Sequence, residues 1–197
     1  MKAIIWKELR ENAKWALLGL TGMLLAEFYT LLSIQGNASQ GTLCSSSFLT
    51  VSLFGCAAIG ASLGVLQILP ERRPDRWATL LHRPISPRAI LLGKIVAGLM
   101  LYLAATFVPL LASTAFVAMP GQFAAPFVGA LMLPALCDIV LGIAMYFLGI
   151  LVCLQRGRWF GRRGVMSMTA LVLLDIAASP WYCLPSVLAG ANFLVAA

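Results

Sequence analysis

The sequence contains little charge and a single histidine, and both shortages narrow the classes of protein to which it can belong. Charged residues make up 11% of the 197 residues, whereas soluble globular domains contain about 25%. One histidine, His82, is too few for a histidine-rich metal site, and the metalloprotease pattern H-E-x-x-H is absent. There is also no Walker A phosphate loop and no D-x-x-D-G cluster for the metals of a membrane phosphotransferase. The sequence therefore predicts no catalytic site and no metal site, in a protein that is not an enzyme.

Apolar residues dominate instead. They make up 61% of the sequence and the mean hydropathy is +0.93, with several runs near the roughly 20 residues that a helix needs to cross a bilayer. We therefore predict one all-α transmembrane domain over residues 1–197, a polytopic membrane protein with five to six transmembrane helices. The five predicted membrane segments are residues 15–34, 48–69, 90–118, 127–154 and 165–178. Residues 184–197 are too few to span comfortably, and we expect a re-entrant segment or an incomplete sixth helix there.

Positive charge lies in three clusters at the borders of these segments. All fourteen Lys and Arg fall within residues 2–14, 72–94 and 156–163, and the alternate loops have none. Because Lys and Arg gather on the cytoplasmic side of membrane proteins, we predict an inner (plasma) membrane protein whose N-terminus and basic loops are cytoplasmic. The same placement argues against nucleic-acid binding, although the net charge is +7.

Residues 2–14 have the pattern of an amphipathic helix. Trp6, Leu9 and Ala13 recur at helical spacing, while Lys7, Glu11 and Lys14 fall on another face. Such helices lie on the membrane surface, and tryptophans anchor them among the headgroups. We therefore predict an interfacial helix in contact with membrane lipids, with Trp6 and Trp15 as its anchors.

Three acids lie within the apolar segments: Glu27, Asp138 and Asp175. An ionised acid at the bilayer centre costs about 2.5–3.5 kcal/mol on insertion scales, so each is expected to face protein, water or a partner. No Lys or Arg lies at their depth. Two interpretations stay open. One is a cation or proton route, and the other is hydrogen bonding between helices, with Asp175 in the outer interface.

Residues 60–64, Gly-Ala-Ser-Leu-Gly, have a small-x-x-x-small spacing. This spacing lets helix backbones approach closely in lipid. It predicts tight packing against a helix that the sequence does not identify.

Five cysteines show no C-x-x-C pair. Cys44 and Cys183 both fall on the predicted outer side, where a disulfide between them and two free thiols are both open alternatives.

The polar stretch between the second and third segments carries the most specific motif. In residues 71–94 a Glu closes the second segment, Leu80-Leu81 precedes Pro84-Ile85-Ser86, an Arg follows, and Gly93-Lys94 opens the third segment. This order resembles the ABC-2 type permease family, the membrane subunits of one class of ABC exporters.

The resemblance covers residues 2–118, and it includes the N-terminus. Trp6-Lys7-Glu8, just before the first segment, looks like the interfacial elbow helix of that family. The chain departs from the family pattern at Arg76-Trp77, where a Gly-Thr is usual, and at Pro87, which separates Ser86 from the following Arg.

The resemblance implies a permease subunit that works as a homo- or heterodimer with a separate ABC ATPase subunit. Residues 70–94 would form the coupling loop and helix, docked in a cleft of the ATPase through an apolar anchor and complementary charge. The implied docking residues are Glu71, Arg72, Arg73, Arg76, Leu80, Leu81 and Arg83. Glu71 is expected to pair with Arg10 or Lys14 of the elbow. This chain would bind no cofactor, because ATP and Mg²⁺ would be bound by the partner subunit.

Two other functions compete with this interpretation. One is an ion- or proton-coupled carrier that uses the intramembrane acids without ATP, and the other is a membrane scaffold that transports nothing. Co-purification of an ATPase separates the first interpretation from both. The sequence does not indicate a substrate.

Overall fold

The computed structural model describes residues 2–35, 42–69, 87–120 and 129–154. Within these ranges the chain is helical and contains no strand. The long helices are α1 (Lys2–Gln35), α2 (Ser46–Ile68), α4 (Pro87–Ala118) and α5 (Leu133–Leu154), joined by the short 3-10 helices η1 (Thr42–Cys44) and η3 (Gly129–Met132).

All four long helices are long and apolar enough to cross a membrane. The predicted count of five to six stays a prediction, because residues 165–178 and 184–197 lie outside the described ranges. The predicted coupling loop also stays a prediction, because residues 70–86 lie outside the described ranges.

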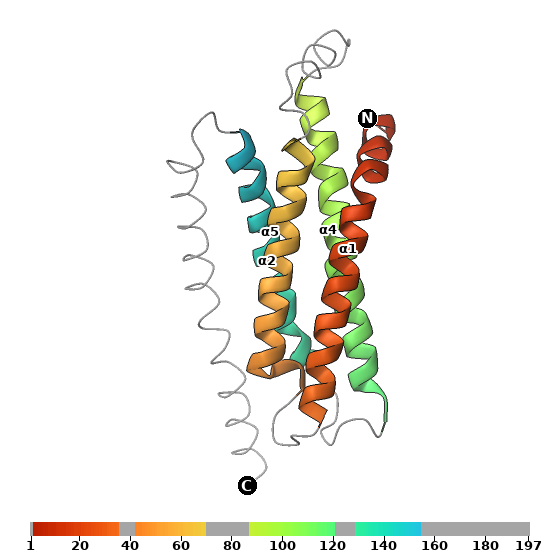
Figure 1. Ribbon diagram of the computed structural model, residues 1–197, viewed down its shortest axis with the longest axis vertical. Coiled ribbons are helices and arrows are strands. Elements are labelled where there is room, and N and C mark those ends of the chain that lie inside the picture. The colour runs from red at the N-terminus through yellow and green to blue at the C-terminus, as the bar shows by residue number, and fades with distance from the viewer. Residues whose placement is uncertain (1, 36–41, 70–86, 121–128, 155–197) are drawn as a thin grey trace.

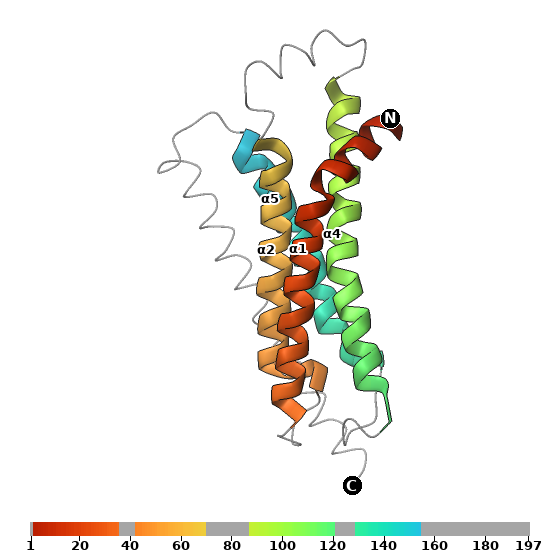
Figure 2. The ribbon, with the colours of Figure 1, turned by 45° about the vertical axis from the view of Figure 1, so that its right-hand side comes forward.

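The four helices form an up-and-down bundle (Figure 1). At one end, called here the N-terminal end, α1 and α4 begin and α2 and α5 end; the opposite end is called the far end. The most extensive contacts join α2 to α5 and α1 to α4, so the bundle consists of two helix pairs. α1 also packs along α2, and Figure 2 shows this contact from a second side.

Glycines explain why α2 packs so closely on α5. A Cβ atom added to Gly60 would meet the backbone of Gly142, and one added to Gly149 would lie 2.6 Å from the carbonyl oxygen of Ala61. Only glycine leaves room for backbones at this distance. The structure thus confirms the tight packing predicted for residues 60–64 and identifies α5 as the neighbour.

The same residues fit the G-x-S-x-G spacing of serine hydrolases. That motif needs a sharp strand-to-helix turn that exposes the serine. Here it lies in the middle of α2, and the Ser62 hydroxyl donates a hydrogen bond to the carbonyl of Ile59 at 3.1 Å. In this chain the spacing therefore does not indicate a serine hydrolase.

The first helix differs from its prediction. An interfacial helix over residues 2–14, separate from the first membrane segment, is not confirmed, because α1 is continuous from Lys2 to Gln35. No proline interrupts this stretch, and helices rarely break without one or another strong breaker. Figure 2 shows the first turns of α1 leaning away from the rest of the helix. Trp6 is 71% exposed and Trp15 is 42% exposed, and their anchoring role stays a prediction.

Prolines and a cap set the other helix starts. The Ser45 hydroxyl accepts a hydrogen bond from the backbone N–H of Phe48 at 3.3 Å and so caps α2. α4 begins at Pro87, three positions before the predicted start, because proline suits the first turn of a helix. α5 begins at Leu133 rather than at residue 127, since residues 129–132 form a 3-10 turn and Pro134 falls in the first turn.

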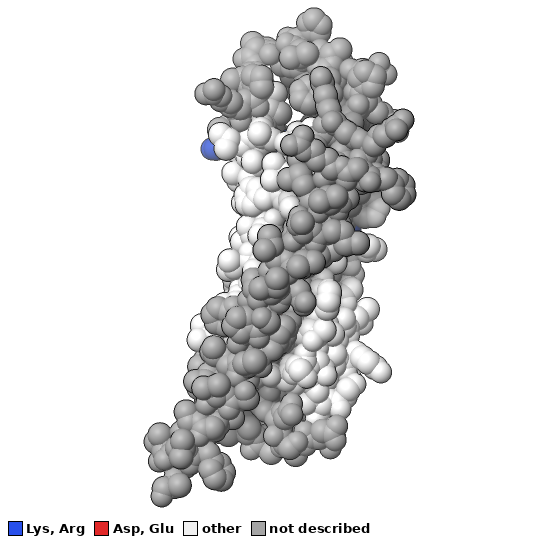
Figure 3. All heavy atoms as spheres, turned by 90° about the vertical axis from the view of Figure 1, so that its left-hand side faces the viewer, with Lys and Arg blue, Asp and Glu red and all other residues white. Residues whose placement is uncertain are grey.

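The outer surface of the bundle is apolar. α1 exposes large side chains along its length, among them Leu18 at 67% and Leu25 at 72%. On the face seen in Figure 3, the described side chains are uncharged except toward the N-terminal end. Exposed apolar surface of this extent suits contact with lipid.

Candidate functional site

Ten polar or charged residues of the described ranges are buried, and those with bonds between helices gather at two levels of the bundle. The full set is Glu8, Glu27, Ser45, Ser52, Gln67, Lys94, Thr106, Ser113, Thr114 and Asp138. Buried polar groups cost free energy unless they are hydrogen-bonded, and in a membrane they mark functional sites. The bundle interior is therefore the candidate functional region.

The first level lies at the N-terminal end. Lys94 Nζ and Glu8 Oε1 form an ion pair at 2.7 Å, and both side chains are 5% exposed. Gln67 Nε2 donates to the carbonyl oxygen of Lys94 at 2.7 Å, and the Tyr146 hydroxyl donates to Gln67 Oε1 at 2.8 Å. We call Glu8, Gln67, Lys94 and Tyr146 the N-terminal cluster. It contains one residue from each long helix, so it ties all four together.

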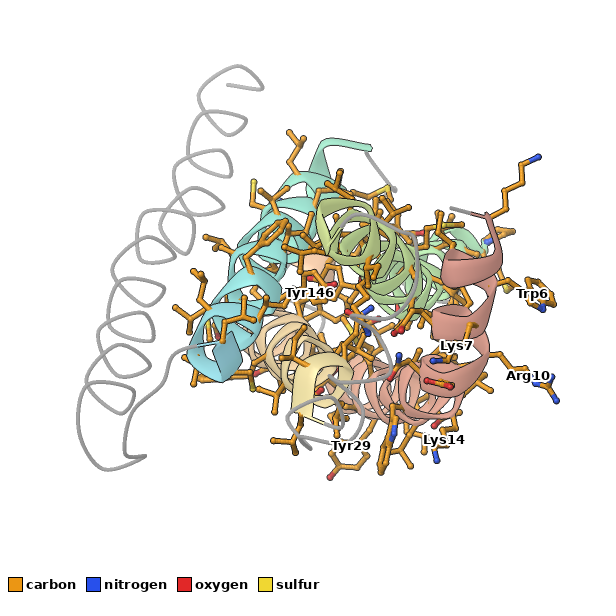
Figure 4. The ribbon with its side chains drawn as sticks, turned by 90° about the horizontal axis from the view of Figure 1, so that it is seen from above. Trp6, Lys7, Arg10, Lys14, Tyr29 and Tyr146 are labelled. Carbon is orange, nitrogen blue, oxygen red and sulfur yellow. The ribbon has the colours of Figure 1, made fainter. Side chains whose placement is uncertain are left out.

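Helical spacing explains why Glu8 faces inward while its neighbours do not. Glu8 lies on the buried stripe of α1 that continues through Ala16 and Met23. Arg10 lies on the opposite side of the helix, and Figure 4 shows it pointing away from the bundle while Tyr146 lies inside it. Lys7 is exposed and pairs with Glu11 at 3.7 Å.

The described ion pair is not the one expected from the sequence. Glu71 lies outside the described residues, so its pairing with Arg10 or Lys14 stays a prediction, and both of those cations are exposed. Glu8 and Lys94 stand in the motifs Trp-Lys-Glu and Gly-Lys, which pointed to the family, but sequence reasoning gave neither residue a role. Their burial was not visible in the sequence.

Tyr102 on α4 and Tyr146 on α5 each pack against a glycine of the other helix. Both α4 and α5 contain the pattern G-x-x-x-Y, as Gly98 to Tyr102 and Gly142 to Tyr146. The hydroxyl of Tyr146 occupies the space that a Cβ on Gly98 would need, and the hydroxyl of Tyr102 does the same at Gly142. Because the helices are antiparallel, each glycine receives the tyrosine of the other helix. The Tyr102 hydroxyl also donates to the carbonyl oxygen of Ile139 at 2.8 Å.

Tyr146→Phe is expected to destabilise the protein by about 1–3 kcal/mol, because it leaves Gln67 Oε1 buried without its donor. Unfolding in a detergent titration followed by circular dichroism measures this loss. The matched control is Tyr29→Phe, since Tyr29 is 73% exposed and the change should be close to zero. An equal effect of the two substitutions would contradict the importance of the Tyr146 hydrogen bond.

The second level holds two acids. Ser113 on α4 donates to Glu27 Oε2 at 2.6 Å, and Ser52 on α2 lies beside the carboxyl of Asp138 on α5. Glu27 Oε1 and Asp138 Oδ2 are buried, and neither has a hydrogen-bond partner within the described ranges. Each helix pair thus contains one acid beside a serine of the other helix.

Helix bounds also revise the depth of these acids. The sequence places both acids within apolar segments, and their position along the bundle comes from the helix bounds. α1 begins at Lys2 and α5 begins at Leu133, which moves Glu27 and Asp138 into the far half of the bundle. Asp175 lies outside the described residues.

The other predicted site residues are only partly placed. The implied docking residues lie outside the described ranges: Glu71, Arg72, Arg73, Arg76, Leu80, Leu81 and Arg83. Cys183 lies outside them too, and Cys44 is a free thiol in the structure, which does not support the disulfide alternative. Cys44 is half-buried beside η3, where its thiol contacts the carbonyl of Leu131 at 3.8 Å, and burial raises the pKa of that thiol.

The geometry therefore supports a membrane bundle braced by an ion pair at one end and by contacts between carboxyl groups and serines in the other half. Among the described residues no three His, Cys, Asp or Glu side chains gather as a metal site would require. Searches among curated proteins and among solved structures gave no match. Residues 5–176 match the sequence profile of a family described as ABC-2 family transporter protein. This match confirms the resemblance drawn from the motifs, and the chain belongs to the ABC-2 family of transporter proteins.

Proposed function

We propose that the chain is the membrane-spanning permease subunit of an ABC-2 type transporter, and that a separate ATPase docks on residues 70–94. The family match supports a transport subunit, and the family in general implies an ABC ATPase partner. The observation that carries the proposal is the position of α4. It begins at Pro87, inside the proposed docking stretch, and the last residue of that stretch, Lys94, belongs to the N-terminal cluster.

The N-terminal end of the bundle is proposed to be cytoplasmic, in the inner membrane. Four cations of α1 support this orientation, because all are exposed near that end: Lys2, Lys7, Arg10 and Lys14. Positive residues favour the cytoplasmic side. The same end holds the start of α4, so residues 70–86 would meet a cytosolic partner.

The proposed mechanism passes motion from the docking stretch into the bundle. A helix transmits a displacement along its axis as a rigid element, so a shift at Pro87 moves Lys94 as well. The ion pair carries that shift to Glu8 on α1, and the bond to Gln67 carries it to α2. The N-terminal cluster would therefore couple ATPase closure to all four helices. ATP and Mg²⁺ would be bound by the partner subunit, and two permease subunits would form the translocation path.

A pull-down from mild detergent tests the docking. We expect an ATPase to accompany the wild-type chain and to be lost from the variant Leu80→Asp/Leu81→Asp, because two carboxylates cannot occupy an apolar cleft. The control, Leu80→Ile/Leu81→Ile, keeps the apolar anchor and should retain the ATPase. If the chain, correctly inserted, never brings down an ATPase, the docking role is wrong.

A further inference from the structure

We propose that Glu27 and Asp138 are proton-binding sites. Each carboxyl holds a proton while its helix pair is closed and gives it up when the pair opens. The proposal goes beyond ATPase docking and does not rest on it, since it concerns bonds inside the bundle only.

The argument begins with a comparison within α1. Glu8 and Glu27 lie on the same buried stripe of the helix, at 4% and 0% exposure. Glu8 Oε1 meets the ammonium group of Lys94 at 2.7 Å. Glu27 Oε2 meets only the uncharged hydroxyl of Ser113, at 2.6 Å. The same residue type, on the same helix and equally buried, therefore has a cation in one place and an alcohol in the other.

A carboxylate buried without a cation needs several hydrogen-bond donors to remain ionised. Glu27 has one donor at Oε2, and its Oε1 has no hydrogen-bond partner. A proton on the carboxyl removes the charge, and the short contact to Ser113 then holds with either oxygen as donor. The geometry thus fits a neutral carboxylic acid.

Asp138 repeats this construction in the other helix pair. Ser52 of α2 lies beside its carboxyl, Oδ2 has no hydrogen-bond partner among the described residues, and Asp138 is 6% exposed. Two acids on different helices, each with one serine and one unpartnered oxygen, are difficult to explain as accidents of packing. A buried carboxyl can also bind a proton without a cavity beside it.

In the part of the chain that the structure describes, the neighbouring titratable groups do not offer a positive charge. Cys56 on α2 lies within electrostatic range of both carboxyls, and Tyr102 on α4 lies within range of Asp138. Both are neutral groups that become negative when they lose a proton. Among the described residues the ion pairs are Lys7 with Glu11 and Lys94 with Glu8, so no cation approaches either carboxyl within 4.0 Å.

Position in the bundle connects the protons to opening. Glu27 and Ser113 lie between α1 and α4, whereas Asp138 and Ser52 lie between α2 and α5. Loss of a proton would place a negative charge inside a pair, and that charge would need water or a cation. Opening of a pair and release of its proton are therefore linked events.

Infrared spectroscopy of the whole chain in lipid at neutral pH tests the proposal. A protonated carboxylic acid has a carbonyl stretching band well separated from the bands of a carboxylate. We expect this band in the wild type, and we expect it to lose intensity in Glu27→Gln and again in Asp138→Asn. Ser113→Ala, which keeps the carboxyl, should shift the Glu27 contribution rather than remove it.

A control comes from the same helix. Glu11→Gln should leave the acid band unchanged and reduce the carboxylate bands instead, because the Glu11 side chain is 55% exposed. A wild-type spectrum without the acid band at neutral pH would overturn the proposal without any variant. A band that both Glu27→Gln and Asp138→Asn leave intact would overturn it as well. Neither result depends on whether an ATPase binds.

Discussion

Lys94→Met is expected to lower the free energy of unfolding by about 3–5 kcal/mol, because it leaves a buried carboxylate without its cation. Methionine has a similar volume, so packing changes little. Glu8 remains 4% exposed, and its other contact is a long one of 3.4 Å from the Asn12 side chain. The loss is measured by titrating SDS into the protein in mild detergent and following helix content.

A double-mutant cycle separates the ion pair from the residues themselves. Replacing both partners, Glu8→Met with Lys94→Met, should restore most of the stability, since removal of a whole buried pair is often close to neutral. Lys7→Met is the matched control on the same helix end. The Lys7–Glu11 pair has a separation of 3.7 Å and side chains 60% and 55% exposed, so its loss should cost at most about 1 kcal/mol.

The comparison of the two single variants decides whether the pair matters. If Lys94→Met costs no more than Lys7→Met, the buried ion pair does not stabilise the closed bundle, and the proposed coupling through it fails too. If the double variant is stable and still binds the proposed ATPase, transport measurements on it show whether coupling needs the two charges.

Long apolar runs made most of the fold predictable. The predicted segments 48–69 and 90–118 differ from α2 and α4 by three residues or fewer at each end, because helix length in a bilayer is set by its thickness. The family was predictable as well, since its motifs are local in sequence.

Contacts between distant residues were not predictable in the same way. Glu8 and Lys94 are 86 positions apart, and no sequence pattern states that both face the interior. The tyrosine arrangement left a faint signal, the repeated G-x-x-x-Y, but the pattern acquires meaning only when α4 and α5 are known to be antiparallel neighbours. Hydropathy also could not show that α1 continues through residues 14 and 15, because a polar start and an apolar remainder form one uninterrupted helix.

Gly64→Val is expected to destabilise the protein by about 3 kcal/mol or more, at the upper end of the cost of overpacking. A Cβ at this position would meet the carbonyl oxygen of Tyr146 and would lie 3.1 Å from the backbone nitrogen of Ile150. Both are backbone atoms of α5, which cannot rotate away as a side chain can. The helices α2 and α5 must therefore move apart, and the close packing of their backbones is lost.

Gly22→Val controls for the general effect of replacing a helical glycine in the membrane. A Cβ on Gly22 meets nothing within 4 Å, so valine there should change stability by less than about 1 kcal/mol. The same detergent titration measures both variants. Similar losses would mean that α2 and α5 do not pack through Gly64. A large loss at Gly64 alone would establish the glycine contact as the reason that the α2/α5 pair holds together, and with it the Asp138–Ser52 contact that lies between the same two helices.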